Sequence, residues 1–244
     1  MKYMGSKARI ANDILPIILK DRKPEQYFVD LFAGGMNIID KVDGNRIAND
    51  INPYLIEFWK GLQKGRLGAM DIPKAIYDNA RNEYNKKTAN SIDFFTIGWI
   101  GFMGSANGRF FEGGYSGISN TTIGTQRDYI SESIRNILKQ MPLIDGIVFN
   151  NLDYRQLEIP SNSIVYCDKP YEDTKKYSHS FNHKEFWDWA RKESKKNKVF
   201  ISEYQAPKDF ECVWEKEVKS SLSANGIIGG SKVSTERLFK YKFN

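Results

Sequence analysis

Short apolar segments rich in β-forming residues alternate with helix-like segments in the first third of the chain. Residues 27–31 (YFVDL) have the composition of a strand that runs into a Gly-Gly loop, and residues 36–42 have helical spacing. A second short strand is expected at 46–49, and Pro53 suits the first turn of the helix that follows. This order predicts the opening of a parallel sheet in an α/β domain.

The last third resumes the alternation and ends in strands with no helix between them. The expected helix spans 183–197, and the expected strands are 147–149, 164–167, 199–201, about 211–218 and 236–243. We therefore expect a mostly parallel sheet that is closed by an antiparallel pair.

The middle of the chain has a different pattern. Residues from about 55 to 103 are mostly helical, residues 104–125 hold six glycines among aromatic and polar residues, and residues 126–140 read as an amphipathic helix. We expect one main domain made of residues 1–54 and 141–244, interrupted by a mostly helical insert at 55–140.

Composition limits the class of protein. The chain has 244 residues, 41% of them hydrophobic, which is enough for one sizeable core and a small inserted module. Two cysteines and two histidines provide neither a disulfide framework nor a zinc cluster, so no metal is expected. The N-terminal apolar stretch is short and is broken by Asn12, Asp13 and Pro16. We expect a soluble protein that is neither exported nor bound to a membrane.

The charge balance permits a polyanionic partner. The net charge is +6, and residues 55–140 carry the largest share, with 11 basic and 8 acidic side chains. No segment is a polybasic arm, so any nucleic-acid surface must be assembled by folding.

Acidic side chains and glycines stand at the ends of the first two expected strands. Asp30 precedes Gly34 and Gly35, and Asp50 follows the second strand, where a carboxylate could accept hydrogen bonds from ribose hydroxyls. A purely structural turn explains the glycine pair equally well, since the G-x-G-x-x-G fingerprint is absent.

The tetrapeptide Asp168-Lys169-Pro170-Tyr171 follows an apolar strand and suits recognition of an exocyclic amine. The carboxylate and a main-chain carbonyl can both accept from an NH2 group, while the tyrosine can stack on a base. The alternative is an ordinary strand-to-loop turn with a packed tyrosine.

Together these signals resemble the ordered motifs of the Dam-type (D12 class) DNA adenine-N6 methyltransferases, which use S-adenosylmethionine (SAM). The motifs are Tyr3-Met4-Gly5-Ser6-Lys7, Asp30-Leu31-Phe32-Ala33-Gly34-Gly35, Asn49-Asp50-Ile51-Asn52-Pro53, Asp153 and Asp168-Lys169-Pro170-Tyr171. The resemblance implies a Rossmann-like methyltransferase fold, with residues 1–54 and 141–244 as the SAM-binding catalytic domain and residues 55–140 as an inserted, mostly helical target-recognition domain.

The resemblance also implies roles for particular residues. Those implied to bind the cofactor are Tyr3, Gly5, Lys7, Asp30, Phe32, Ala33, Gly34, Gly35, Asp50, Asp153 and Asp168. Among them, Asp50 is expected to hold the ribose hydroxyls and Asp153 the adenine amine of SAM. The catalytic tetrapeptide, residues 168–171, is expected to grip a flipped target adenine. Candidate DNA contacts are Lys86, Lys87, Arg109 and Arg127, although a solvated helix end accounts for the two lysines equally well.

The family's usual tetrapeptide is D-P-P-Y, and this chain departs from it at Lys169. A flexible cation then stands near the expected place of the positively charged sulfonium, which predicts that Lys169→Pro raises or preserves the methylation rate. Tyr177 and Phe181 could line the same pocket, although core packing is the better explanation for Phe181.

Two functions remain open for the chain. The first is site-specific methylation of adenine N6 in double-stranded DNA with SAM, in the cytoplasm of a bacterial or phage-infected cell, with room for a cognate restriction endonuclease as partner. The second is a catalytically silent relative that acts as a SAM- or DNA-binding module, an alternative favoured by Lys169. An RNA or protein-amide methyltransferase is disfavoured because those enzymes tend to carry Asn in place of Asp168.

Overall fold

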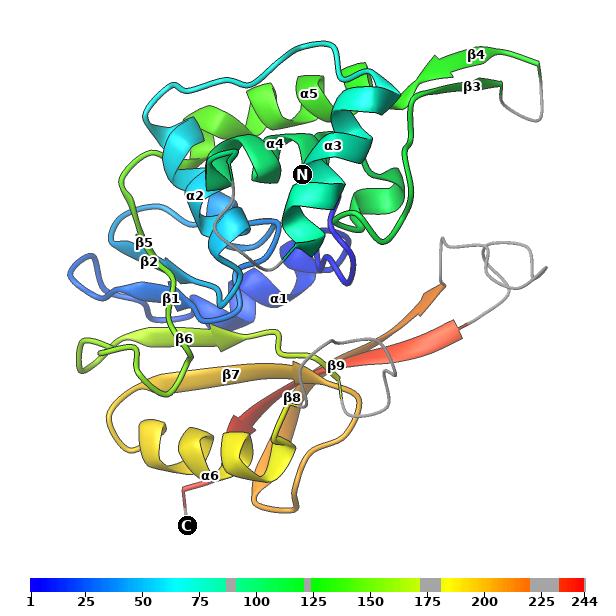
Figure 1. Cartoon of the computed structure of the whole chain (residues 1–244). Coiled ribbons are helices and arrows are strands. Elements are labelled where there is room, and N and C mark those ends of the chain that lie inside the picture. The colour runs from blue at the N-terminus through cyan, green and yellow to red at the C-terminus, as the bar shows by residue number, and fades with distance from the viewer. Residues whose placement is uncertain (87–90, 121–123, 172–180, 220–232, 244) are drawn as a thin grey trace.

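The computed structural model describes residues 1–86, 91–120, 124–171, 181–219 and 233–243. Its centre is a seven-stranded sheet in the order β5-β2-β1-β6-β7-β9-β8 (Figure 1). Five strands are parallel: β1 Phe28–Asp30, β2 Arg46–Asn49, β5 Ile147–Asn150, β6 Ile164–Cys167 and β7 Lys198–Glu203. The antiparallel strands are β8 Phe210–Lys219 and β9 Val233–Tyr241. The expected mixed α/β fold with a mostly parallel sheet is confirmed.

The central strands are buried on both faces, as their apolar sequences require. Phe28 of β1 belongs to a core cluster with Ile14 of α1 (Ala11–Ile18), whereas Val29 belongs to a second cluster with Phe186 of α6 (His183–Glu193). Because successive side chains on a strand point to opposite faces, α1 and α6 cover different faces of the sheet. The sequence patterns did not predict α1, which contains Pro16.

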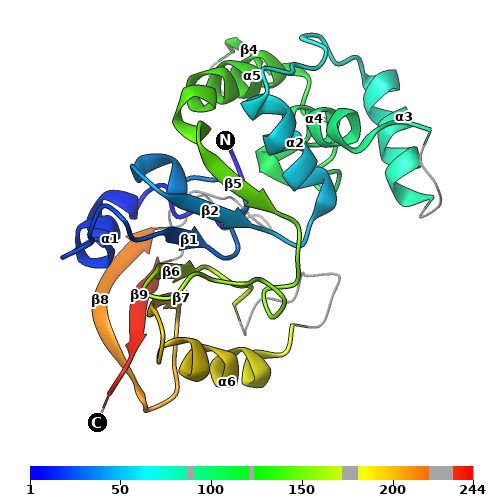
Figure 2. The ribbon, with the colours of Figure 1, turned by 90° about the vertical axis from the view of Figure 1, so that its left-hand side faces the viewer.

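The β2–β5 connection, residues 50–146, is mostly helical. Its helices are α2 Pro53–Gln63, α3 Lys74–Asn85, α4 Phe94–Gly104 and α5 Tyr129–Gln140, and its short strands are β3 Ile118–Asn120 and β4 Gln126–Asp128. These helices lie on the far side of β5, beyond one edge of the sheet. Helix α6 lies beside β7, toward the opposite edge (Figure 2). Helix α4 is buried almost throughout, and at Gly98 a Cβ atom would lie 2.5 Å from the carbonyl oxygen of Tyr54 in α2. Glycine therefore permits close contact between α4 and α2.

Two expectations for secondary structure were wrong. Residues 36–42 do not form an α-helix, because Met36 adopts a positive φ of 58° and only a short 3-10 turn, η1 at Ile39–Lys41, follows. Residues 126–128 form β4 and pair with β3, so α5 starts only at Tyr129, where the Asp128 side chain accepts from the first free N–H groups. Two further 3-10 turns are η2 Ala106–Gly108 and η3 Met141–Ile144. In the described part of the chain, no helix is long and apolar enough to cross a membrane.

Candidate active site

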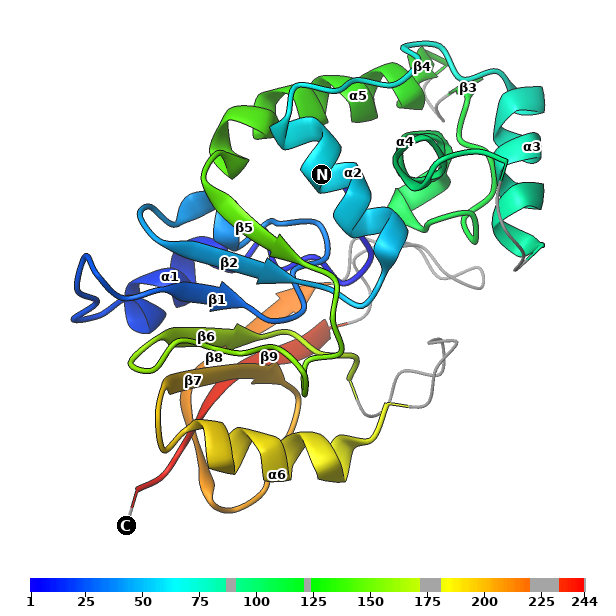
Figure 3. The same cartoon turned by 60° about the vertical axis from the view of Figure 1, so that its left-hand side comes forward.

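The parallel strands end at one edge of the sheet, toward which their arrowheads point in Figure 3. The register pairs Asp30 at the end of β1 with Tyr166 of β6, and Asn49 at the end of β2 with Asn150 of β5. The four acidic residues implied by the resemblance, Asp30, Asp50, Asp153 and Asp168, therefore follow four neighbouring strands at this edge. Such an edge is where α/β sheets bind ligands.

Asp30 is the most deeply buried of these acids, with 2% of its surface exposed. Burial raises the pKa of its carboxyl well above the usual range, and the charges of Asp168 and Asp50 add to the effect. Oδ1 of Asp30 is buried and has no hydrogen-bond partner among the residues that the structure describes. A buried acceptor without a donor fits a ligand that brings a donor or a cation.

Asp50 organises the glycine loop after β1. Its Oδ2 accepts from the Gly34 N–H at 3.1 Å, and its Oδ1 accepts from the Asn52 N–H at 3.0 Å. Burial raises the pKa of the Asp50 carboxyl, although the N–H groups that it accepts from oppose this shift. Gly34 has a φ of +46°, which favours glycine. This loop conformation is the one in which the Gly34 N–H donates to Asp50.

The N-terminal motif lies directly on this loop. A Cβ atom at Gly34 would lie 2.7 Å from the Tyr3 ring, and one at Gly35 would lie 2.7 Å from Cβ of Tyr3. Tyr3 also lies 6.1 Å, between ring centroids, from Phe102 of α4. The structure thus brings the first motif and the glycine loop together, next to the β2–β5 connection.

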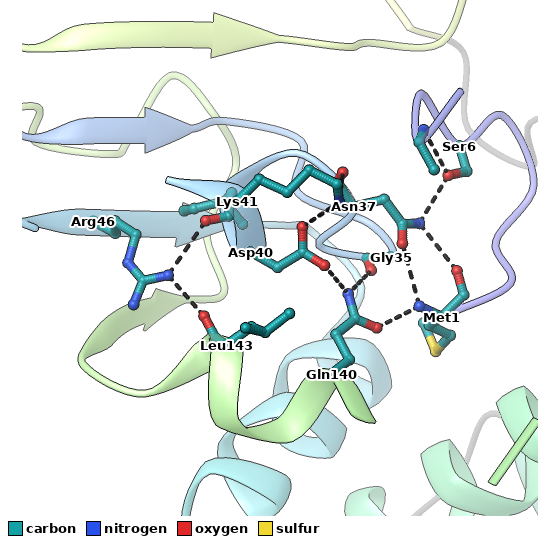
Figure 4. A network of polar contacts seen from close by, with 11 residues as sticks. Met1, Ser6, Gly35, Asn37, Asp40, Lys41, Arg46, Gln140 and Leu143 are labelled. Atoms are coloured by element: carbon teal, nitrogen blue, oxygen red, sulfur yellow. Dashed lines mark hydrogen bonds and ion pairs between the residues drawn. The ribbon is translucent and has the colours of Figure 1, made fainter. Parts of the chain in front are cut away.

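A polar network joins the same loop to α5 (Figure 4). The buried Gln140 side chain donates to the Gly35 carbonyl at 3.1 Å and to Asp40 Oδ2 at 2.8 Å. The Asn37 amide donates to the Met1 carbonyl at 3.0 Å and to Ser6 Oγ at 2.8 Å. One set of hydrogen bonds therefore holds the end of α5, the glycine loop and the N-terminal motif together.

Asp168 and Tyr171 share a cationic neighbour, Lys7. The Lys7 ammonium lies 3.3 Å from Asp168 Oδ1, 3.6 Å from Glu236 Oε2 and 4.4 Å from the centroid of the Tyr171 ring. The Tyr171 hydroxyl donates to Glu236 at 2.9 Å, and its ring meets that of Tyr204 edge-on at 4.6 Å. These contacts bring the N-terminal motif, residues 3–7, to the Asp168–Tyr171 tetrapeptide.

The environment shifts the pKa values of this pair. Burial raises the pKa of Asp168 to about 6, against the opposing effect of Lys7. Burial lowers the pKa of the Lys7 ammonium, but Asp168 and Glu236 outweigh burial and the net shift is upward. An acid that titrates so close to neutrality in a cluster of charges is typical of a functional site.

Lys169 does not place its charge where the sequence suggested. Its side chain is fully buried, forms an ion pair with Glu203 at the end of β7, and lies 3.2 Å from His183 Nδ1. The expectation of a loose cation beside the cofactor is therefore wrong, because burial requires the ammonium to keep a carboxylate partner.

Asp153 has a partner within the protein. Arg155 binds its two carboxylate oxygens at 2.8 and 2.7 Å, and this pairing lowers the pKa of Asp153. Arg155 also donates to Glu185 of α6 at 2.9 Å. An amine that approaches Asp153 would share this carboxylate with the guanidinium.

Aromatic rings line the side of α6 next to the glycine loop. Phe32 lies 5.6 Å from Tyr154, 5.9 Å from Phe181 and 6.0 Å from Phe186, between ring centroids. Phe181 thus packs against the second core cluster, which agrees with core packing as the explanation for this residue. Tyr177 lies outside the described residues.

The candidate DNA contacts differ in how well their charges are satisfied. Arg127 pairs with Glu132 at 2.5 Å, and Lys86 pairs with Glu83, while Lys87 lies outside the described residues. Arg109 is half-buried, and its Nε has no hydrogen-bond partner in the part of the chain that the structure describes.

Sequence reasoning missed Glu203 and Glu236. Glu203 could have been found, because it is an acidic residue two positions after the expected strand 199–201. Glu236 could not, because it reaches the site only through the antiparallel pairing of β9 with β7. Among the described residues, no group of three or more His, Cys, Asp or Glu side chains could hold a metal.

The mostly parallel sheet, with four acidic side chains at its carboxyl edge, is consistent with a Rossmann-like methyltransferase fold. A sequence profile of the D12 class N6 adenine-specific DNA methyltransferases matches residues 3–98. The resemblance seen in the motifs is thereby confirmed for residues 3–98, over which the chain is similar to this family.

Two characterised proteins are similar over a longer stretch. The chain is 28% identical over 218 residues to the Type II methyltransferase M.FokI of Planomicrobium okeanokoites, which covers 78% of this chain and 31% of that protein. It is 26% identical over 194 residues to the modification methylase StsI of Streptococcus sanguinis, covering 70% of this chain and 28% of that protein. The chain thus spans less than a third of the length of either relative.

Proposed function

We propose that the chain is a site-specific DNA methyltransferase that transfers a methyl group from SAM to N6 of adenine. The observation that carries this proposal is the pairing of β1 with β6, which sets the orphaned Asp30 carboxylate beside the Asp168–Tyr171 tetrapeptide. The residues proposed to bind the cofactor and those proposed to bind the target amine then adjoin each other. The family match and the names of both relatives support the same chemistry.

The residues present fit SAM. The orphaned Asp30 oxygen provides an acceptor for a positively charged donor, and Gly34 and Gly35 admit the Tyr3 side chain against the loop. We propose that Phe32, Ala33, Asp50 and Asp153 complete this pocket and that Tyr3, Gly5 and Lys7 close it. When bound, SAM supplies an electrophilic methyl group on its sulfonium.

The catalytic step then depends on Asp168 and Tyr171. Adenine N6 is a poor nucleophile because its lone pair is delocalised into the ring. In its ionised form, the Asp168 carboxylate accepts a hydrogen bond from the NH2 group together with a main-chain carbonyl, which favours a localised lone pair. The Tyr171 ring stacks on the base and offsets part of the cost of extruding it from the duplex. After transfer, the amine loses one proton, for which Asp168 is the nearest proposed acceptor.

In the structure, Lys7 takes up the interactions that this mechanism gives to the base. Its ammonium contacts both the Asp168 carboxylate and the face of Tyr171. Base entry therefore requires Lys7 to withdraw, and Glu236 at 3.6 Å offers a carboxylate that can retain the ammonium. Lys7 thus keeps the pocket electrostatically satisfied until a target base replaces it.

We propose residues 55–140 as the target-recognition domain for double-stranded DNA, with Arg109 as its first candidate contact. Support comes from the net charge of this segment and from the Gly108 turn, where a Cβ atom would lie 2.3 Å from the Lys2 carbonyl oxygen. The loop that carries Arg109 therefore adjoins the first motif. We also propose that the chain acts inside a bacterial or phage-infected cell, with room for a cognate restriction endonuclease as partner.

The proposal is tested by incubating the purified chain with duplex DNA and SAM labelled in its methyl group. We expect labelled DNA from the unaltered chain and none from Asp168→Ala, while titration calorimetry detects SAM binding by both. SAM binding without label transfer by the unaltered chain would contradict the proposal and support the silent-module alternative. The absence of both from a folded sample would contradict the cofactor assignment as well.

A further inference from the structure

Lys169, the second residue of the Asp168–Tyr171 tetrapeptide, forms a buried ion pair with Glu203 at the end of β7. Side-chain exposure is 0% for Lys169 and 4% for Glu203. The ammonium lies 5.4 to 5.8 Å from the ring centroids of Phe186, Trp187 and Phe181, so aromatic side chains surround it. A charge in such surroundings is stable only while its partner remains in place.

His183 is a further polar neighbour of this pair. Its Nδ1 lies 3.2 Å from the Lys169 Nζ, within hydrogen-bonding distance. Lys169 is thus held by a carboxylate on β7 and by the first residue of α6.

Glu203 connects this pair to the other end of the tetrapeptide. Its Oε1 accepts from the Tyr204 N–H at 2.8 Å, and the Tyr204 ring packs edge-on against Tyr171. Arg237 of β9 donates to the Tyr204 carbonyl at 2.7 Å. The second and fourth residues of the tetrapeptide are therefore both fastened to the end of β7.

We propose that Lys169 and Glu203 form one positioning unit that holds the Asp168–Tyr171 turn against β7. The unit sets the Asp168 carboxylate and the Tyr171 ring at the separation that a bound base requires. Neither residue touches the base. This inference rests on the proposed function and adds to it the element that fixes the geometry of the amine-binding pocket.

The unit explains why a proline alone cannot replace Lys169. Lys169→Pro restricts the turn but leaves the Glu203 carboxylate buried and unpaired, so that variant is expected to be destabilised. Glu203→Gln removes the charge while keeping the oxygen that accepts from Tyr204. The proposal therefore predicts that Lys169→Pro leaves the stability of the protein intact only when it is combined with Glu203→Gln.

Two double variants separate positioning from stability. Lys169→Met/Glu203→Gln removes both charges and leaves a flexible turn, whereas Lys169→Pro/Glu203→Gln removes both charges and restricts the turn. We expect both to fold and to bind SAM as the unaltered chain does. Lys216→Met, which breaks the exposed Lys216–Asp13 pair at 2.8 Å away from the site, is the matched control.

Two measurements decide the matter. In the Met/Gln variant, we expect faster hydrogen exchange at the Tyr171 amide and single-turnover methylation slowed by about tenfold or more, since small misplacements at a reacting centre have large effects. In the Pro/Gln variant, we expect slower exchange and faster methylation than in the Met/Gln variant, because the restricted turn holds Tyr171 in place of the ion pair. In the control, we expect exchange and rate to match the unaltered chain. A Met/Gln variant with unchanged exchange or an unchanged rate overturns the inference. If the unaltered chain itself transfers no methyl group, the proposed function has failed, and the exchange measurement still decides whether the pair holds the turn.

Discussion

At the scale of single residues, Asp168 and Tyr171 carry the proposed chemistry through different contacts. Asp168→Ala removes the acceptor for the target amine, so we expect methyl transfer to fall by about 10²-fold or more, as when a preorganised hydrogen-bonding group is lost. Tyr171→Ala removes base stacking worth roughly 1–3 kcal/mol and should weaken DNA binding and turnover together. Single-turnover rates and SAM titrations on both variants check this, and full turnover by either one would disprove the catalytic assignment.

The pKa of Asp168 gives the reaction a pH dependence with a definite sign. The ionised carboxylate is the stronger acceptor for the amine and the form that can take up its proton, and the pKa of Asp168 is about 6, so kcat/KM for DNA should rise with pH through about 6 and then level off. Lys7 lowers this pKa, so in Lys7→Met the rising limb should move to higher pH. Lys7→Arg keeps the charge and should keep the limb near its original position. A limb that stays in place in Lys7→Met would show that Lys7 does not act on Asp168.

At the scale of elements, Gln140 joins α5 to the glycine loop. Gln140→Leu leaves the Gly35 carbonyl and one Asp40 oxygen without this buried donor, so we expect a stability loss of about 1–3 kcal/mol and weaker SAM binding. Gln63→Leu is the matched control, because the Gln63 amide donates in the same way to the carbonyls of Ile144 and Ile147, away from the glycine loop. Denaturant unfolding and SAM titration separate the two. Equal SAM affinities in the two variants would mean that the Gln140 hydrogen bonds stabilise the fold without affecting SAM binding.

The helices and strands could be predicted where they depend on residues that are close together in the sequence. Strands such as β6 follow from four consecutive apolar residues, and β8 and β9 were placed within about three residues of their observed bounds. The helix expected at 36–42 failed because a left-handed Met36 ends any helical path, and spacing alone does not encode that turn.

The site was predictable where its residues follow strands in sequence. Asp30, Asp50 and Asp168 could be placed at one edge of the sheet because parallel strands end together. The pairing of Lys169 with Glu203 could not be predicted, because Glu203 lies 34 residues further along the chain and meets Lys169 only through the pairing of β6 with β7. The pairing of Lys7 with Asp168 likewise depends on the tertiary path of the N-terminal segment.

At the scale of the whole molecule, the net charge of +6 predicts a salt-dependent affinity for DNA. Arg127 and Lys86 already have carboxylate partners, whereas the Arg109 guanidinium forms no ion pair among the described residues. We expect duplex affinity to fall as salt rises and Arg109→Met to reduce the slope by about one phosphate contact. Lys216→Met should leave the slope unchanged. An unchanged slope in Arg109→Met would remove Arg109 from the interface.

The central claim is that this molecule methylates adenine in DNA at N6, and the most direct test identifies the product atom. Duplex DNA that lacks modified bases is incubated with SAM and the purified chain and then digested to nucleosides for mass spectrometry, with Asp168→Ala treated in parallel. The account predicts N6-methyl-2′-deoxyadenosine as the product, formed by the unaltered chain and missing from the variant. Methylated cytosine, or methylated adenine at equal levels in both samples, would contradict it.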